Sequence, residues 1–170
     1  PFRRMPEDVA QQVSEGVALL ARNTSGARAR FRTNSPYVAI HAEMASVCRM
    51  DHMAFTGILG FDLYGRKVAK DVYLGTFRPP LDLQGGYESI IALPEGGEWD
   101  ITLYFPLYNG VDRLWIGLQA GCSIAPPRAY ELPQPIVFYG SSITQGGCAS
   151  RPGNSFAAIA ARMLDCDFIN

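Results

Sequence analysis

Residues 136–147, IVFYGSSITQGG, decide the fold of the C-terminal part of the chain. This run begins with four consecutive apolar residues, too few for a helix and without the alternation of a half-exposed strand. Such a run is typical of a central parallel strand that is buried on both faces. The strand is expected to end at Gly140. Ser141 and Ser142 would then lie at its carboxyl end, the edge of an open α/β sheet where ligands bind.

A helix and a second strand are expected after this loop. Apolar residues recur at the spacing of one helix face, which predicts a helix with one buried face. These residues are Phe156, Ile159, Ala160, Met163 and Leu164. Asn154 or Ser155 would cap the helix at its N-terminus. Residues 167–170 could begin the next strand, and together these elements would form a right-handed β-loop-α-β unit with the serines in its first loop.

Short runs of alternating apolar and polar residues fill the chain before Pro133. Residues 27–32 and 37–44 alternate cleanly, and a hairpin between them would bring Glu43 close to Arg28, Arg30 or Arg32. Turns rich in Gly and Pro separate the further runs. These runs are 61–64, 68–74, 87–93, 101–105 and 114–118. Several short strands without a long helix predict a β-sandwich.

The two ends of this β-rich part have their own patterns. Residues 6–11 have Pro and acidic residues where a short helix would begin, and the apolar residues 17–20 suggest a strand. Residues 123–135 contain four prolines and predict a stiff linker. Because the pattern changes there from alternating strands to β-α-β, the domain boundary is expected in this linker.

Three polar or aromatic residues of the strands could have a role outside the core. Tyr104 and Trp115 point away from the apolar faces of their runs. They are expected to be covered by the next domain, although they could instead form a sugar-stacking platform. Asp62 is unusual inside a strand and is expected to accept backbone hydrogen bonds at a turn or domain junction, not to act in catalysis.

Composition excludes some classes of function. The chain has 170 residues, 48% of them apolar and 18% charged, which is enough for one domain and part of another. The net charge of −1 gives no basis for binding a nucleic-acid backbone, so no nucleic-acid partner is predicted. No run approaches the roughly 18 apolar residues of a membrane-spanning helix. The first residues, PFRR, contain neither an initiator Met nor a signal peptide, so the N-terminus is expected to be missing and localisation stays open, with periplasmic or extracellular among the possibilities.

Cysteine and histidine spacing gives no sign of a metal site. The four cysteines, Cys48, Cys122, Cys148 and Cys166, are widely and irregularly spaced, which favours neither a zinc site nor a disulfide framework. His41 and Glu43 could be imagined as ligands, but no third ligand stands at a suitable spacing. No metal and no cofactor are predicted, and the oligomeric state stays open.

Two motifs resemble parts of the SGNH/GDSL hydrolases. Residues 139–147, followed by 151–156 (RPGNSF), resemble the first block of these enzymes, in which Gly-Asp-Ser carries the nucleophile. Gly140-Ser141-Ser142 stands in that place, with Ser141 in place of the usual Asp, a variant found in one bacterial branch. Residues 60–64, GFDLY, resemble the Gly-x-Asp-Leu-Tyr signature of a β-rich domain that precedes the hydrolase domain in this branch.

This resemblance implies a multi-domain chain. Residues 1–133 would form an N-terminal all-β sandwich, jelly-roll-like, and 134–170 the first β-α-β portion of an α/β flavodoxin-like SGNH hydrolase domain. The implied function is a serine esterase that removes acetyl or similar groups from a small-molecule or carbohydrate ester. Ser142 would be the catalytic nucleophile, and its backbone N–H one oxyanion donor.

The rest of the implied catalytic site has no match in the sequence. The family's other oxyanion donors and its Asp-x-x-His base are expected beyond Asn170, so these 170 residues are expected to be an inactive fragment. His41 and His52 are less favoured as the base because both belong to the β-rich part. The serines could also form a plain strand-to-helix turn, and the chain a non-catalytic carbohydrate-binding or interaction module. A phosphate-binding loop fits poorly because no Gly-Lys-Ser/Thr is present. The elbow motif G-x-S-x-G also fails, since Thr144 replaces its last Gly.

Overall fold

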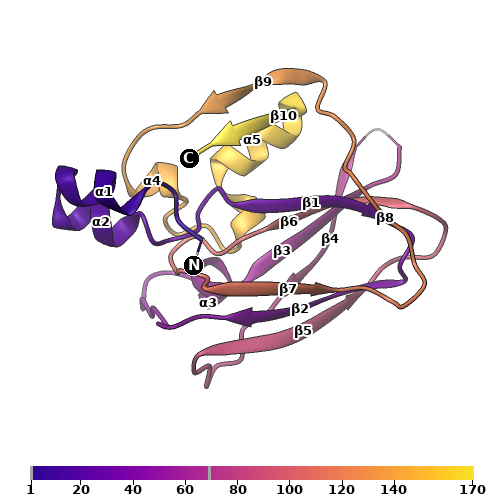
Figure 1. The fold of residues 1–170 in the computed structure, drawn as a ribbon, viewed down its shortest axis with the longest axis horizontal. Coiled ribbons are helices and arrows are strands. Elements are labelled where there is room, and N and C mark those ends of the chain that lie inside the picture. The colour runs from indigo at the N-terminus through magenta and orange to yellow at the C-terminus, as the bar shows by residue number, and fades with distance from the viewer. Residues whose placement is uncertain (1, 69) are drawn as a thin grey trace.

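The computed structural model describes residues 2–68 and 70–170; Pro1 lies outside the described residues, as does Ala69 in the predicted run 68–74. Eight of the described strands form two antiparallel sheets. A two-stranded parallel sheet and its connecting helix lie beside them (Figure 1). None of the described helices has the length and hydropathy that a bilayer-spanning helix needs.

The two antiparallel sheets contain every strand predicted from the alternating runs. The larger sheet has the order β4-β3-β6-β1-β8, and the smaller one has the order β5-β2-β7. Strands of the larger sheet are β1 Arg28–Thr33, β3 Phe61–Arg66, β4 Asp71–Phe77, β6 Trp99–Tyr104 and β8 Ile124–Ala125. Strands of the smaller sheet are β2 Tyr37–Glu43, β5 Gly86–Ala92 and β7 Arg113–Gly117.

One apolar core lies between these sheets. Alternation along the strands directs Phe31, Leu63 and Leu103 of the larger sheet into it, and Val38 and Ile40 of the smaller sheet meet them there. Burying an apolar side chain of this size contributes roughly 1.5–3 kcal/mol. The shared core therefore holds the two sheets face to face as the predicted β-sandwich.

The predicted hairpin between the first two strands is wrong. β1 and β2 lie in different sheets, and Glu43 pairs with Arg113 of β7 at 2.8 Å. The β1 arginines have partners elsewhere: Arg28 pairs with Asp167, and Arg30 lies 3.8 Å from Asp100. Alternation identifies which side of a strand faces the core, but it carries no information about the neighbouring strand.

Short helices precede and interrupt the sandwich. They are α1 Glu7–Val13, α2 Glu15–Leu20 and α3 Phe55–Leu59. The first agrees with the expected helix, whereas the strand expected at 17–20 is wrong. Ser14 caps α2, and its Oγ accepts a hydrogen bond from the Val17 N–H at 3.2 Å. A short apolar run fits either element, and here the N-cap favours the helix.

The C-terminal residues form the predicted strand-loop-helix-strand unit. Its elements are β9 Leu132–Val137, α4 Ser142–Gln145, the 3-10 turn η1 Pro152–Asn154, α5 Phe156–Leu164 and β10 Cys166–Ile169. β9 and β10 pair in parallel. Ser155 caps α5, since its Oγ accepts a hydrogen bond from the Ala158 N–H at 3.4 Å.

Burial in this unit differs from the expectation. β9 is not covered on both faces by the described residues, because Ile136 and Phe138 pack inward while Val137 is 66% and Tyr139 fully exposed. The α5 face expected to be buried is also largely exposed. Its residues Phe156, Ile159, Met163 and Leu164 are 39–81% exposed.

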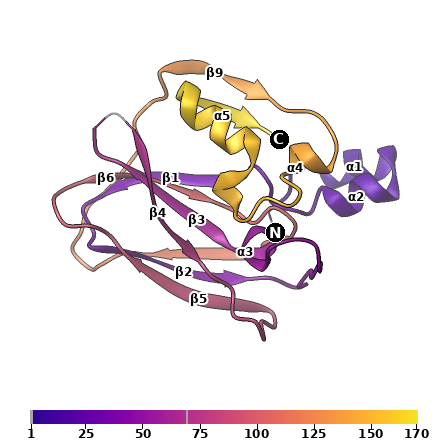
Figure 2. The same ribbon diagram turned by 180° about the vertical axis from the view of Figure 1, so that it is seen from behind.

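α5 instead packs through its small residues. Ala157, Ala158 and Ala161 lie against Tyr64 and Tyr104 on the outer face of the larger sheet (Figure 2). Alanine side chains allow a helix to approach the aromatic rings closely, so this second apolar stripe makes the contact. The prediction that Tyr104 is covered by the next part of the chain is confirmed.

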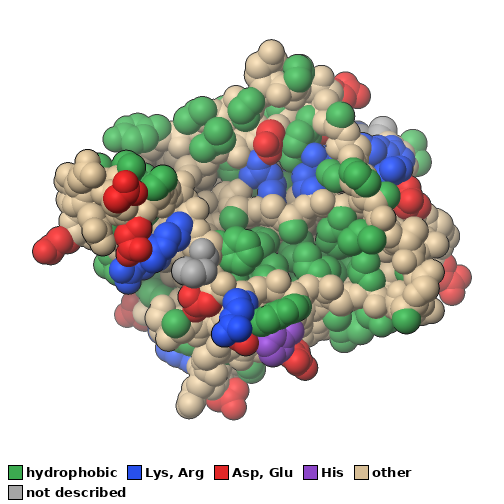
Figure 3. Space-filling view, viewed as in Figure 1, with side chains coloured by type: hydrophobic (Ala, Val, Ile, Leu, Met, Phe, Trp, Pro, Cys, Tyr) green, Lys and Arg blue, Asp and Glu red, His purple; other side chains and the backbone are tan. Residues whose placement is uncertain are grey.

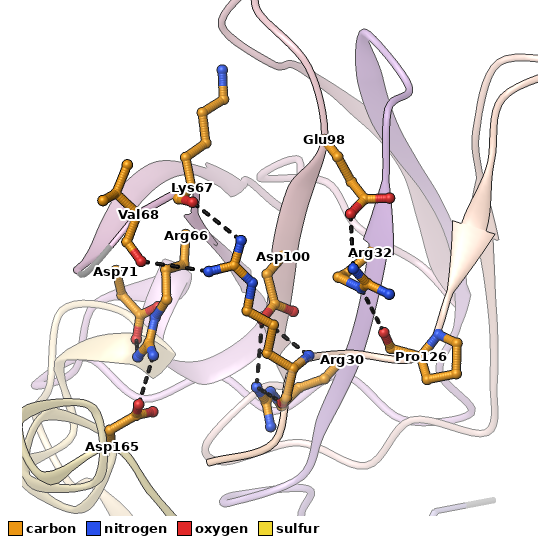
Figure 4. Close-up of polar contacts among 11 residues, drawn as sticks. Arg30, Arg32, Arg66, Lys67, Val68, Asp71, Glu98, Asp100, Pro126 and Asp165 are labelled. Carbon is orange, nitrogen blue, oxygen red and sulfur yellow. Dashed lines mark hydrogen bonds and ion pairs between the residues drawn. The ribbon is translucent and has the colours of Figure 1, made fainter. Parts of the chain in front are cut away.

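The proline-rich connection lies on the sandwich and ends in β9. The Arg30 guanidinium donates to the Arg128 carbonyl at 2.9 Å, and the Arg128 N–H donates to the Asp100 carboxylate at 3.2 Å. Arg32 donates to the Pro126 carbonyl at 2.9 Å (Figure 4). The arginine ladder of β1 therefore binds the connection between the two parts of the chain.

Candidate active site

Ser142 lies just beyond the carboxyl end of β9, as the sequence predicts. Phe138 still pairs with β10, since its N–H donates to the Ile169 carbonyl at 2.8 Å. Ser141 is extended, with φ −90° and ψ −156°, and Ser142 is the first residue of α4. Both serines are exposed. The loop therefore presents the Ser142 side chain at the sheet edge.

Two glycines make this turn tight. A Cβ at Gly140 would lie only 2.3 Å from the Thr144 Oγ1 atom, so a side chain there would force Thr144 to move. Gly146 ends α4 in the left-handed region at φ +102°, and its N–H donates to the Ile143 carbonyl at 3.0 Å. Ser142 is therefore held on one short helical turn.

The β-sandwich part supplies hydrogen bonds to the carbonyls of this turn. The Tyr108 hydroxyl donates to the Ser142 carbonyl at 3.0 Å, and the Ser25 hydroxyl donates to the Gln145 carbonyl at 2.5 Å. Burial raises the pKa of the Tyr108 phenol above its ordinary value. The backbone of the serine turn is thus fixed by Tyr108, which precedes Ser142 by 34 positions, and by Ser25, which precedes Gln145 by 120 positions.

Gln145 extends this attachment to the N-terminal helices. Its side chain is buried; Nε2 donates to the Leu107 carbonyl at 3.0 Å, and Oε1 accepts from the Arg4 guanidinium at 3.0 Å. Arg4 also donates to the Leu20 carbonyl at 2.7 Å. Burial removes water from the Arg4 charge and lowers the pKa of that guanidinium. A chain of hydrogen bonds through Arg4 and Gln145 therefore links α2 to the serine turn.

A cavity of about 460 Å³ opens beside Ser142. Ser141, Ser142 and Gln145 contribute polar groups to its lining. Apolar parts of the wall come from both ends of the chain, and include Met5, Val17, Leu20 and Phe138. Val17 and Leu20, from the run that suggested a strand, thus face this cavity. It offers an apolar group room next to the serine hydroxyl.

No general base accompanies Ser142 among the described residues. Within that part of the chain, no His, Asp or Glu lines the cavity, and no side chain hydrogen-bonds the Ser142 hydroxyl. His41 lies on the outer face of the smaller sheet, and His52 lines a separate hollow around residues 49–55. A serine hydroxyl is a weak nucleophile until a base takes its proton.

The two motifs quoted from the sequence meet at Asp62. Its carboxylate is fully buried; one oxygen accepts from the Gly153 N–H and from Arg151, both at 2.8 Å, and the other accepts from the Thr76 hydroxyl at 2.6 Å. Asp62 was expected to accept backbone hydrogen bonds at a turn or domain junction, and it does accept one from Gly153, which lies in the turn η1. The loop that follows the serine turn is therefore anchored in the larger sheet.

Arg151 and the aromatic residues around it complete this junction. Its guanidinium donates to the Tyr64 hydroxyl at 2.8 Å and lies 3.8 Å from the centre of the Tyr73 ring. Burial disfavours its charged form, but the hydrogen bonds to Tyr64 and Asp62 and the charge of Asp62 outweigh this, and the pKa of Arg151 is raised. Arg162 of α5 also lies over Tyr64, 4.1 Å from the centre of its ring.

A second set of charges joins α5 to the sheet. Arg66 of β3 pairs with Asp71 at 2.9 Å and with Asp165, the C-cap of α5, at 2.7 Å (Figure 4). The hydrogen bonds to Asp165 and Asp71 raise the pKa of Arg66. Because Arg66 bridges both carboxylates, the end of α5 is fixed on the same sheet as its beginning.

The residues that hold the serine turn were missed in the sequence. Tyr108 and Ser25 lie in loops, and Arg4 lies before the first helix. None stands at a regular spacing from Ser142, so no local pattern could have identified them. Gln145 was part of the quoted block, but only its burial reveals its role.

Comparison with known proteins agrees with this two-part arrangement. Residues 1–124 match the family described as the GxDLY N-terminus of SGNH-hydrolase-type esterases. Residues 133–170 match the GDSL-like lipase/acylhydrolase family. No curated protein matches the chain.

Two solved structures are similar over almost the whole chain. One, described as a GDSL-like lipase from Bacteroides ovatus, is 29% identical with a TM-score of 0.90, and the match covers 99% of this chain and 49% of that one. The other, the salicylyl-acyltransferase SsfX3 from a tetracycline biosynthetic pathway, is 24% identical with a TM-score of 0.68, covering 98% and 45%. The second likeness concerns the fold alone. The chain spans about half the length of each.

Fold and site together define an N-terminal β-sandwich that anchors a serine-bearing strand-loop-helix-strand unit. The match over 1–124 gives the family itself. The chain belongs to the GxDLY N-terminal family of SGNH-hydrolase-type esterases, and it continues into a segment of the GDSL-like lipase/acylhydrolase family.

Proposed function

We propose that Ser142 is the nucleophile of a serine esterase that removes acetyl or similar acyl groups from a carbohydrate. The observation that carries this proposal is the place of Ser142, at the end of β9 and open to a partly apolar cavity of about 460 Å³. The hydroxyl would attack the acyl carbon, and the backbone N–H of Ser142 would donate to the developing oxyanion. That the alcohol part of the ester is a carbohydrate is inferred from the resemblance to the family alone.

The domain division belongs to the same proposal. Residues 1–133 would be a jelly-roll-like accessory domain, and 134–170 the first β-α-β portion of a flavodoxin-like hydrolase domain. A His and Asp pair would come from residues beyond 170. The length of the two solved relatives supports this, and so does the lack of a His, Asp or Glu in the described lining of the Ser142 cavity.

The accessory domain has a defined part in this proposal. Tyr108 and Ser25 hold the carbonyls of the serine turn, and Arg4 holds Gln145. Preorganised positions for nucleophile and oxyanion donor are the main way in which such a site lowers the barrier to acyl transfer. The sandwich would thus fix the nucleophile's backbone and form one wall of the acyl site.

Labelling with a fluorophosphonate tests the nucleophile directly. A protein that extends this chain to the length of its solved relatives should be labelled on Ser142, as located by mass spectrometry of the labelled peptide. It should also hydrolyse an activated acetyl ester, whereas residues 1–170 alone should not turn it over. Labelling of Ser141, or turnover by residues 1–170 that His41→Ala or His52→Ala abolishes, would contradict the proposal.

A further inference from the structure

The outer face of the smaller sheet carries residues that the esterase proposal does not use. Strand register places Glu88 of β5 and Trp115 of β7 directly opposite His41 of β2. In the next row on the same face, Ala39 lies between Ile90 and Gly117. A row of large functional side chains thus lies beside a row with two very small residues.

This change in size creates a slot. Ala39 and Gly117 form its floor, while Trp115 and Ile90 rise on either side, 47% and 61% exposed. The hollow has a volume of about 510 Å³. It lies on the side of the sandwich opposite to α5, which packs on the larger sheet. The expectation that the next part of the chain covers Trp115 is therefore wrong for the described residues.

The polar groups around the slot are held in place. His41 Nδ1 lies 2.8 Å from the Glu88 carboxylate and must donate, since an ionised carboxylate only accepts. The His41 ring meets the Trp115 ring edge-on, with 5.0 Å between centroids and 66° between planes. At the next row, Glu43 pairs with Arg113 at 2.8 Å. Figure 3 shows histidine, acidic and basic side chains beside hydrophobic ones over the smaller sheet.

We propose that this slot binds a neutral pyranose unit of an oligosaccharide or polysaccharide. A sugar ring has an apolar C–H face that stacks on an exposed Trp, and a rim of hydroxyls that donate to carboxylates and to an imidazole nitrogen. The slot offers one exposed ring, the Glu88 carboxylate and the His41 Nε2 atom around a floor without bulky side chains.

Charge selects among sugars. Glu88 lines the slot, whereas Glu43 and Arg113 in the neighbouring row pair with each other. A uronic-acid chain would bring further negative charge close to Glu88, which is unfavourable. The slot therefore favours neutral sugars over acidic ones. This site does not depend on Ser142, so failure of either proposal leaves the other standing.

Trp fluorescence provides a direct test because the chain has two Trp residues. Trp99 is 6% exposed in the core, so a spectral change reports on Trp115. Residues 1–170 are titrated with cellohexaose, xylohexaose and mannohexaose, and with polygalacturonate. We expect at least one neutral hexaose to shift the emission with a Kd on the order of 0.1–1 mM, as suits a shallow site.

Calorimetry on variants tests whether the sugar binds in the slot or on another surface. Trp115→Ala should weaken binding about tenfold or more, and Ala39→Leu should do the same by filling the floor while keeping the Trp. Glu88→Gln should reduce the difference in affinity between the neutral hexaoses and polygalacturonate. The control Ile124→Ala, on an exposed residue of β8, should bind like the unmodified chain. The proposal is overturned if no neutral hexaose binds, if polygalacturonate binds more tightly, or if neither slot variant weakens binding.

Discussion

The Asp62 carboxylate accepts a hydrogen bond from the backbone N–H of Gly153 at 2.8 Å, and this contact joins the two parts of the chain. Asp62 lies in the GxDLY motif of β3, and Gly153 lies in the turn that follows the serine loop. The carboxylate is fully buried and therefore needs hydrogen-bond donors, and Arg151 and Thr76 supply two more. The motif is thus a structural anchor for the serine-bearing segment.

Asp62→Asn should destabilise the chain by about 2–4 kcal/mol. The amide removes the negative charge that compensates Arg151, and its NH2 group places a donor against either Gly153 and Arg151 or the Thr76 hydroxyl. Chemical denaturation of residues 1–170 measures this as a lower midpoint. The control Asp51→Asn makes the same chemical change on a fully exposed side chain and should shift the free energy of unfolding by less than about 0.5 kcal/mol. Equal shifts in both variants would show that Asp62 has no anchoring role.

Two glycine substitutions should have opposite effects on stability. A Cβ at Gly153 would lie 2.4 Å from a Tyr64 ring carbon and 2.9 Å from the Asp62 carboxylate, so Gly153→Ala should destabilise by about 1–3 kcal/mol. Gly16 lies inside α2, with no atom closer than 3.9 Å to a new Cβ. Gly16→Ala should raise stability by up to about 1 kcal/mol through helix propensity. Thermal unfolding of both variants measures the difference; a stabilising Gly153→Ala would contradict the tight junction.

Tyr108→Phe should lower the kcat of the longer enzyme with little change in KM. The substitution removes the hydroxyl that donates to the Ser142 carbonyl, while the Gly147 N–H still donates at 2.7 Å, so a loss of roughly three- to tenfold is expected. Tyr87→Phe is the control, because it removes a hydroxyl that likewise lies within hydrogen-bond distance of backbone carbonyls, those of Leu59 and Phe77, but inside the core and away from Ser142. Both variants should lose about 1 kcal/mol of stability. A kcat loss shared by Tyr87→Phe would mean that stability, and not positioning, explains the effect.

Sequence patterns predicted the strands and helices themselves better than they predicted which of these elements lie side by side. Alternation correctly identified the inward residues of β1 and β2, yet Glu43 pairs with Arg113 and not with a β1 arginine. Alternation depends on the two faces of one strand, whereas pairing depends on the path of the chain between sheets. The same limit applies to α5, which has two apolar stripes. The stripe of large residues was expected to be buried, but the alanines make the contact because they allow a closer approach.

The site was only partly predictable for a similar reason. The position of Ser142 follows from local signals, namely an apolar run, a glycine and the start of a helix. The contacts of Tyr108 and Ser25 with the serine turn depend on how the sandwich packs against it, and no local spacing encodes that packing. Asp62 was an exception, because a carboxylate inside a strand needs hydrogen-bond donors wherever it lies.

The nucleophile proposal predicts different kinetics for the two adjacent serines. Ser142→Ala in the longer enzyme should lower kcat on the order of 10³-fold or more, since a nucleophile and its base act as a unit. Ser141→Ala should cost at most a few-fold. No described group hydrogen-bonds the Ser141 side chain at the start of α4, and its contribution to the turn is the carbonyl that accepts from the Gln145 N–H at 3.1 Å. Alanine keeps that carbonyl.

The measurement is kcat and KM for both variants with an activated acetyl ester. The free energy of unfolding of each variant serves as the control. Both serines are exposed, so both substitutions should leave stability within about 0.5 kcal/mol. A large kcat loss in Ser142→Ala at unchanged stability then reflects chemistry at the hydroxyl. Near-normal kcat in Ser142→Ala would contradict the assignment and leave these residues as a strand-to-helix turn, whose side chains the reaction does not need.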